Sequence, residues 1–130
     1  MITVDQYFAG YPNDPGITDQ IRLNAQQLLD YVNPLLSRID LPVNPATGTQ
    51  VSGEKDGGWR PQTCPIGAPN SAHKQGRAVD VYDPEGALDD WLTDELLAVY
   101  GLYREHPGST RGWCHLTDRA PASGKRTFYP

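Results

Sequence analysis

Three side chains suited to binding a metal ion stand in or beside two short β-like segments. Asp80 lies within residues 78–82, His73 precedes that segment by a few residues, and His115 lies within residues 112–117. Two histidines and one aspartate form a ligand set that can hold a catalytic zinc and leave a fourth position for water. The sequence therefore predicts a Zn2+ site formed by His73, Asp80 and His115.

Side-chain alternation explains how two of these ligands would meet. Side chains in a strand point alternately to opposite faces, so Asp80 faces away from the valines that flank it, and His115 faces away from its apolar neighbours. If the two segments pair in one sheet, both ligands project into the same cleft. Gly76 allows the sharp turn that brings His73 back from the preceding loop.

The residues around these ligands match a longer pattern. Residues 71–80 follow Ser-x-His-x-x-Gly-x-Ala-x-Asp, residues 113–115 follow Trp-x-His, and residues 58–60 are Gly-Trp-Arg. The pattern resembles the zinc D-Ala-D-Ala carboxypeptidase family, which includes bacterial D,D-carboxypeptidases and dipeptidases and phage L-alanyl-D-glutamate endolysins, and which shares its metal-site architecture with the hedgehog domain. The resemblance runs from about residue 57 to residue 116, about half of the chain.

The resemblance implies a fold, an activity and a substrate. The expected fold is α+β, with a small antiparallel sheet that carries the metal site and packs against two or three helices. The expected activity is zinc-dependent hydrolysis of peptidoglycan stem peptides, at L-Ala-D-Glu or D-Ala-D-Ala bonds, by a phage or prophage lytic enzyme. The chain is acidic, with a net charge of -5, which argues against nucleic acid as a partner.

Four residues are candidates for contacting substrate. The resemblance supports Arg60, whose planar guanidinium can bind a substrate carboxylate or polarise the scissile carbonyl. Gln62 offers an amide nearby, Ser71 can bond the substrate backbone or brace its own loop, and Trp113 can form a wall of the cleft.

The catalytic base is the weak point of the enzymatic interpretation. A zinc hydrolase needs a carboxylate that accepts a proton from water and passes it to the leaving amine. The family usually places this carboxylate three residues before the last ligand histidine, where this chain has Gly112. Glu105, in a turn-rich hairpin, is the best remaining candidate, and His106 beside it is a second one. Asp118 follows His115 by three residues, and alternation points it to the other face.

Gly112 also supports a second hypothesis. Under this hypothesis, the domain is a structural or binding part of a phage particle that keeps the zinc site and has little or no catalytic turnover. A third hypothesis is a vestigial cleft without metal, against which the intact His73, Asp80 and His115 argue.

Length and termini set the remaining expectations. The 130 residues suit one domain that spans residues 1–130, without a separate wall-binding domain, and we expect a monomer. The N-terminus lacks the basic region and apolar core of a signal peptide, and no apolar run is long enough for membrane insertion. The expected location is the host cytoplasm or a phage particle, with action on the bacterial cell wall.

Apolar spacing predicts the elements around the site. Residues 1–16 are expected to form an arm that packs its aromatic side chains on the body. Residues 18–39 are predicted to form a helix that kinks or restarts near Pro34, and residues 83–100 a second helix capped by Asp83.

The two cysteines, Cys64 and Cys114, are expected to be unpaired thiols. Neither is predicted to bind zinc, because the histidines and the aspartate already supply a sufficient set.

Overall fold

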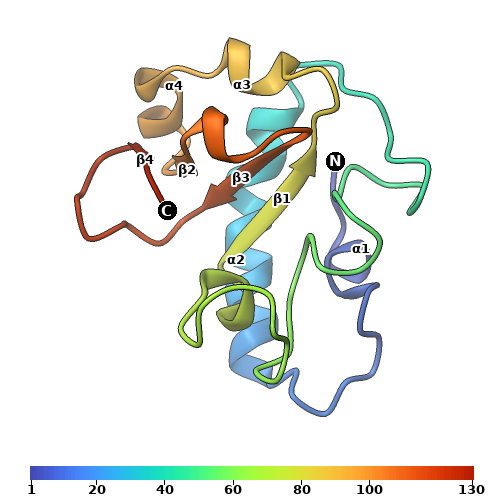
Figure 1. Ribbon diagram of the computed structural model, residues 1–130. Coiled ribbons are helices and arrows are strands. Elements are labelled where there is room, and N and C mark those ends of the chain that lie inside the picture. The colour runs from blue at the N-terminus through green and yellow to red at the C-terminus, as the bar shows by residue number, and fades with distance from the viewer.

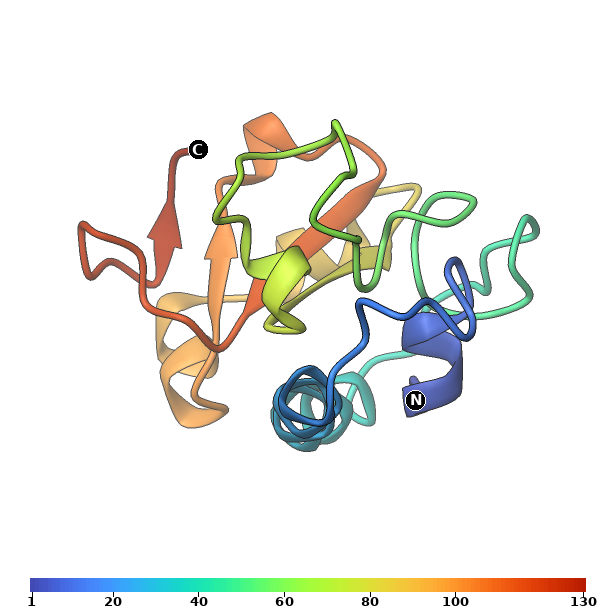
Figure 2. The same ribbon diagram turned by 90° about the horizontal axis from the view of Figure 1, so that it is seen from below.

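A four-stranded sheet lies at the centre of the computed structural model, which describes residues 1–130 (Figure 1). Its strands lie in the order β1-β3-β2-β4 and comprise β1 (Ala78–Tyr82), β2 (Tyr103–Glu105), β3 (Trp113–Thr117) and β4 (Thr127–Phe128). The long helix α2 (Asp19–Leu36) crosses one face of the sheet, and the segment 58–76 covers the opposite face (Figure 2). The architecture is a small α+β fold, as predicted.

The sheet is mixed, so the expectation of a purely antiparallel sheet is wrong for its last strand. β3 is antiparallel to both β1 and β2, whereas β4 pairs in parallel with β2. The physical reason is the return of residues 118–126, which reverse the chain after β3. Because β2 lies between β3 and β4 and already runs opposite to β3, a strand that also runs opposite to β3 must be parallel to β2.

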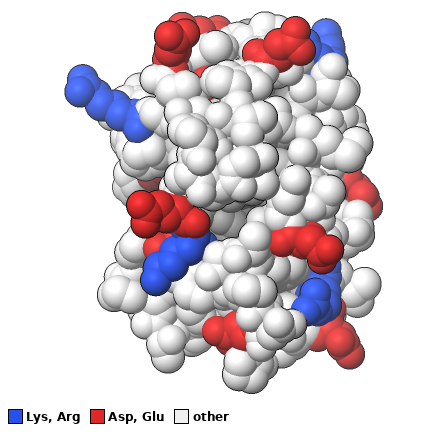
Figure 3. All heavy atoms as spheres, turned by 90° about the vertical axis from the view of Figure 1, so that its right-hand side faces the viewer, with Lys and Arg blue, Asp and Glu red and all other residues white.

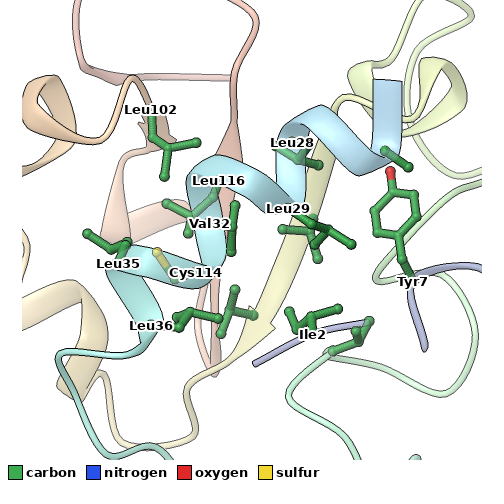
Figure 4. Packing of buried hydrophobic residues seen from close by; sticks show 14 of the residues in the cluster. Ile2, Tyr7, Leu28, Leu29, Val32, Leu35, Leu36, Leu102, Cys114 and Leu116 are labelled. Carbon is green, nitrogen blue, oxygen red and sulfur yellow. The ribbon is translucent and has the colours of Figure 1, made fainter. Parts of the chain in front are cut away.

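The core lies between the sheet and α2. The face of the sheet opposite the predicted ligands packs its apolar side chains against the helix, and Figure 4 shows Cys114 and Leu116 among the inward-facing side chains of α2. Those α2 side chains are all fully or nearly fully buried and comprise Ala25, Leu28, Leu29, Val32, Leu35 and Leu36. The α2 side of β1 and β3 is thus committed to the core, which leaves the other side for the site.

The helix α2 is continuous through Pro34 and ends at Leu36, three residues earlier than predicted. Thr18 is its N-cap, as its hydroxyl accepts a hydrogen bond from the Ile21 amide. The helix tolerates the proline because Pro34 lies in its last turn, where one missing amide bond costs little. Neither a kink into a second helix nor a restart at residue 33 occurs.

Residues 1–16 pack their aromatic side chains on the body, as predicted, and contain a short helix, α1 (Val4–Phe8). Thr3 and Gln6 form a capping box that starts this helix. The buried Tyr7 hydroxyl donates to the Ala78 carbonyl at 2.8 Å, and burial raises the pKa of Tyr7 well above its usual value. The arm is therefore tied directly to the first residue of β1.

Residues 83–100 form two short helices, α3 (Ala87–Trp91) and α4 (Asp94–Val99), where one helix was predicted. Leu92 is extended between them, and Thr93 caps α4 by accepting a hydrogen bond from the Leu96 amide. The helix count is therefore four, above the predicted two or three. The N-cap of α3 is Gly86 and not Asp83 as predicted, but the Asp83 carboxylate still accepts the first-turn amides of Leu88 and Asp89 at 3.0 and 3.1 Å.

Short 3-10 helices precede two of the strands, η1 (Ala72–Gln75) before β1 and η2 (Pro107–Ser109) before β3. Both cysteines are free, as predicted, and both are buried. Burial raises the pKa of the Cys114 thiol well above its usual value, which keeps it protonated and unreactive.

Candidate metal centre

Three ligand atoms meet on the face of the sheet that points away from α2. Asp80 on β1 lies directly opposite His115 on β3, as strand alternation predicted. The Asp80 Oδ1 atom is 2.9 Å from His115 Nδ1 and 3.2 Å from His73 Nε2, and the two nitrogens are 3.3 Å apart. His73 and Asp80 are buried, and His115 is half-buried. The structure therefore brings all three predicted ligands together.

The spacing of these atoms fits a small metal ion. Ligands that lie 2.0–2.1 Å from a tetrahedral zinc are about 3.3 Å from one another. The three measured separations, 2.9, 3.2 and 3.3 Å, approach this value without any rearrangement. The group can hold a metal ion with little cost of reorganisation.

His73 is held in the orientation that a metal ligand needs. Its Nδ1 atom is 2.8 Å from the Gly58 carbonyl oxygen, which can only accept, so Nδ1 carries the proton and donates. The Nε2 lone pair then faces Asp80 and His115. A hydrogen bond from the second ring nitrogen to a carbonyl is the usual support of a histidine that binds metal.

The turn before β1 gives His73 this position. Ser71 is the N-cap of η1, and its hydroxyl accepts a hydrogen bond from the His73 amide. Gly76 ends η1 at a φ of 74°, a left-handed conformation that favours glycine. A Cβ atom at this position would also lie 2.8 Å from the Ile21 carbonyl oxygen of α2. The Ser-x-His-x-x-Gly pattern is thus explained by the path of the chain.

The two oxygens of Asp80 have different partners. Oδ1 faces the histidines, and Oδ2 accepts a hydrogen bond from Arg60 Nη2 at 3.2 Å. Burial alone would raise the pKa of Asp80, but in the metal-free protein the positive charge of a doubly protonated His73 and hydrogen bonds from both protonated histidines outweigh it and hold that pKa well below its usual value. The aspartate is therefore ionised at neutral pH and presents one oxygen to the centre.

Arg60 contacts a metal ligand as well as the open cleft. Its Nε donates to the Asp56 carbonyl at 2.8 Å, and its Nη2 donates to Asp80. Nη1 makes no hydrogen bond within the protein, so it remains available to a bound molecule. The predicted substrate contact and a role in orienting Asp80 are compatible, since they use different nitrogens.

A cleft of about 610 Å³ opens over the three ligands. Three predicted residues besides Arg60 line it, namely Ser71, Glu105 and Trp113. Glu105 is its only side-chain carboxylate apart from Asp80, and it forms no ion pair. The cleft thus contains the ligands together with one further acid.

Strand register explains why Glu105 faces the cleft. Arg104 on β2 pairs with Leu116 on β3, and extending this antiparallel register by one residue sets Glu105 beside His115. On its other side Glu105 pairs with Phe128 of β4, whose ring lies 6.1 Å from the His115 ring. Asp80, His115, Glu105 and Phe128 therefore form one row across the four strands.

Two predicted residues lie outside this cleft. Gln62 donates from its amide to the Pro69 carbonyl at 2.8 Å and is exposed. His106 follows Glu105, so alternation turns it away, and its ring stacks on Tyr129 with ring centres 4.5 Å apart. Gly112, at a φ of 87°, is also absent from the lining.

Arg119 is a cleft residue that the sequence interpretation missed. Its Nη1 atom donates to the Asn70 carbonyl at 3.0 Å and to Gln75 Oε1 at 2.8 Å, and no carboxylate pairs with it. The remainder of this wall comes from the C-terminal segment, mainly residues 120–122 and 128–130. Only the return of the chain after β3 brings these residues to the site, and no local pattern signals it.

Surface charge bears on the class of partner. On the face shown in Figure 3, acidic and basic side chains are interspersed within a larger uncharged area. None of the helices combines the length and the apolar character that crossing a membrane requires. The expected absence of a nucleic-acid partner stays a prediction.

No family model, curated protein or solved structure matches the chain. The peptidase resemblance of residues 57–116 therefore stays a prediction. The observation that indicates a metal centre is the geometry of His73, Asp80 and His115.

Proposed function

We propose that the protein is a zinc-dependent peptidase that hydrolyses peptidoglycan stem peptides and serves a phage or prophage as a lytic enzyme. The observation that supports it best is the set of three preorganised ligand atoms beneath a cleft that holds one further carboxylate. Two imidazoles and a carboxylate suit zinc better than magnesium or calcium, which prefer oxygen ligands alone. His73, Asp80 and His115 would hold the ion.

Each residue has a defined part in this mechanism. Bound zinc supplies Lewis-acid chemistry, which polarises a carbonyl and makes water more acidic. Glu105, the neighbour of His115 across the strands, accepts the proton of the attacking water and returns it to the leaving amine. Arg60 orients Asp80 through Nη2 and offers Nη1 to a substrate oxygen. The Ser71 hydroxyl, which accepts from the His73 amide, keeps its own proton for a substrate carbonyl.

Digestion of purified peptidoglycan tests the proposal. Zinc-loaded protein should release peptides with new termini, identified by mass spectrometry, and a chelated sample should release none. Glu105→Gln should lower turnover at least a hundredfold while zinc content and melting temperature stay unchanged, because general base catalysis contributes about 10²–10⁴-fold. Glu95→Gln in α4, an exposed acid outside the cleft, is the matched control and should retain full activity.

One observation favours a second function. The position at which the resembling family has its catalytic carboxylate is Gly112, which supports a phage structural or binding protein that keeps the zinc site. This alternative predicts a folded protein that binds one zinc, sediments with peptidoglycan and cleaves nothing. If Glu105→Gln were instead fully active, the peptidase proposal would stand and the assignment of Glu105 as the base would be wrong.

A further inference from the structure

The segment of residues 58–60 holds two of the three metal ligands in place. The Gly58 carbonyl accepts a hydrogen bond from His73 Nδ1 at 2.8 Å, and the Arg60 amide donates to the His73 carbonyl at 3.3 Å. Arg60 also donates from Nη2 to Asp80 Oδ2 at 3.2 Å. Because partners of this kind orient the ligands of a metal, a shift of the segment would disturb both His73 and Asp80.

The N-terminal arm packs behind this segment. The Trp59 amide donates to the Tyr7 carbonyl at 3.3 Å, and a Cβ atom at Gly58 would lie 2.0 Å from the same carbonyl oxygen, so the two backbones are in close contact. The Trp59 side chain is 2% exposed, and the rings of Phe8 and Tyr11 lie 6.1 and 6.0 Å from it. The arm precedes the part of the chain that the sequence resemblance covers, so the resemblance predicts no role for it.

Tyr11 ties the arm to the loop of residues 52–57. Its hydroxyl donates a hydrogen bond to the Asp56 carboxylate, and the Asp56 main-chain carbonyl accepts from Arg60 Nε at 2.8 Å. Residues 53–55, just before Asp56, are exposed and offer little packing that could fix its position. A chain of hydrogen bonds therefore runs from Tyr11 through Asp56 and Arg60 to Asp80.

We propose that Tyr11 is a positioning residue of the metal centre, which acts through Asp56 and Arg60 to hold Asp80 in its ligand orientation. This inference rests on the metal centre of the proposed function, whichever bond the enzyme cleaves. Direct partners of metal ligands contribute about 10–100-fold to metal affinity, and Tyr11 stands two hydrogen bonds behind such a partner, so we expect it to contribute about fivefold.

Three substitutions and one titration test the inference. Tyr11→Phe deletes the hydroxyl and keeps the ring beside Trp59. Tyr100→Phe is the matched control, because Tyr100 is also half-buried, accepts one hydrogen bond from Arg38 at 3.2 Å and lies outside the cleft. Arg60→Met removes the guanidinium and so interrupts the route to Asp80. The measurement is the zinc Kd of each folded variant, obtained by competition with a chromophoric chelator well below the melting temperature.

We expect Tyr11→Phe to raise the zinc Kd about fivefold and Tyr100→Phe to leave it unchanged. In the Arg60→Met background, Tyr11→Phe should cause no further change, because the route is already broken. A hydroxyl that only stabilises the fold would lower the melting temperature without changing the Kd of the folded protein, so the titration separates positioning from stability.

Four results would overturn the inference. They are an unchanged Kd in Tyr11→Phe, an equal rise in Tyr100→Phe, a rise that persists in the Arg60→Met background, and no zinc binding by the intact protein. The last of these would also remove the metal centre. Tight zinc binding without cleavage of peptidoglycan would count against the peptidase alone, and the Kd values would still decide the role of Tyr11.

Discussion

Removal of one ligand histidine is expected to abolish stabilisation by zinc. The variant is His115→Ala, which deletes the nitrogen that lies 2.9 Å from Asp80 Oδ1 and 3.3 Å from His73 Nε2. In the intact protein the ligand atoms already stand at distances that suit a tetrahedral ion, so the folded state should bind zinc far better than the unfolded chain does. By mass action zinc must then raise the melting temperature.

The size of the effect follows from linkage. Zinc at a hundred times its Kd stabilises the folded state by about 2.7 kcal/mol. Unfolding entropy is about 2.1 cal/mol/K per residue, or about 0.27 kcal/mol/K for this chain of 130 residues, so the Tm should rise by about 10 °C. If loss of His115 weakens zinc binding about a thousandfold, the same zinc concentration raises the Tm by less than about 1 °C.

Melting curves measured by circular dichroism, with and without chelator, provide the assay. The matched control is His106→Ala, which removes the remaining histidine of the chain, stacked on Tyr129 and outside the ligand group. This control should keep the full shift. An unchanged Tm of the intact protein in zinc would contradict this prediction. A full Tm shift in His115→Ala, or a lost shift in His106→Ala, would contradict it as well.

Two further predictions concern the metal-free protein. The pKa of Asp80 is lower in the folded state than in the unfolded state, so the ionised carboxylate stabilises the fold fully above the unfolded-state pKa and progressively less as the pH falls. Urea titrations of chelated protein should therefore show a loss of stability below about pH 4. Asp80→Asn should reduce that loss. An unchanged pH slope in Asp80→Asn would contradict this. Tyr7→Phe should cost about 1–2 kcal/mol in the free energy of unfolding, because it removes a buried hydrogen bond to the Ala78 carbonyl; a change below about 0.3 kcal/mol would show that this bond contributes little.

The ligand pair could be predicted from the sequence because its signal is local. In each of β1 and β3 the apolar side chains alternate with the ligand, so one face is committed to the core and the other carries Asp80 or His115. The helix α2 was equally predictable from the spacing of its apolar residues, apart from its last turn.

The remaining features depend on contacts between distant parts of the chain. The strand β2 has only three residues, too few for a periodic pattern, so its pairing with β3 could not be predicted. The return of residues 118–126, which brings Arg119 and β4 to the cleft, has no local signal either. The break in the second predicted helix did have a local sequence signal, since Thr93 followed by two acidic residues is a typical helix start.

The position of Glu105 connects the fold with the proposed chemistry. A carboxylate at position 112 would be placed by the chain just before β3, whereas Glu105 reaches the same face of the sheet from β2, one strand further along the row that begins with Asp80 and His115. Directly opposed side chains have Cβ atoms about 4.5–5.5 Å apart, which lets a glutamate reach the neighbourhood of a ligand histidine without a loop movement. With Gly112 there is no carboxylate just before β3, and the register of β2 instead places Glu105 on the same face of the sheet.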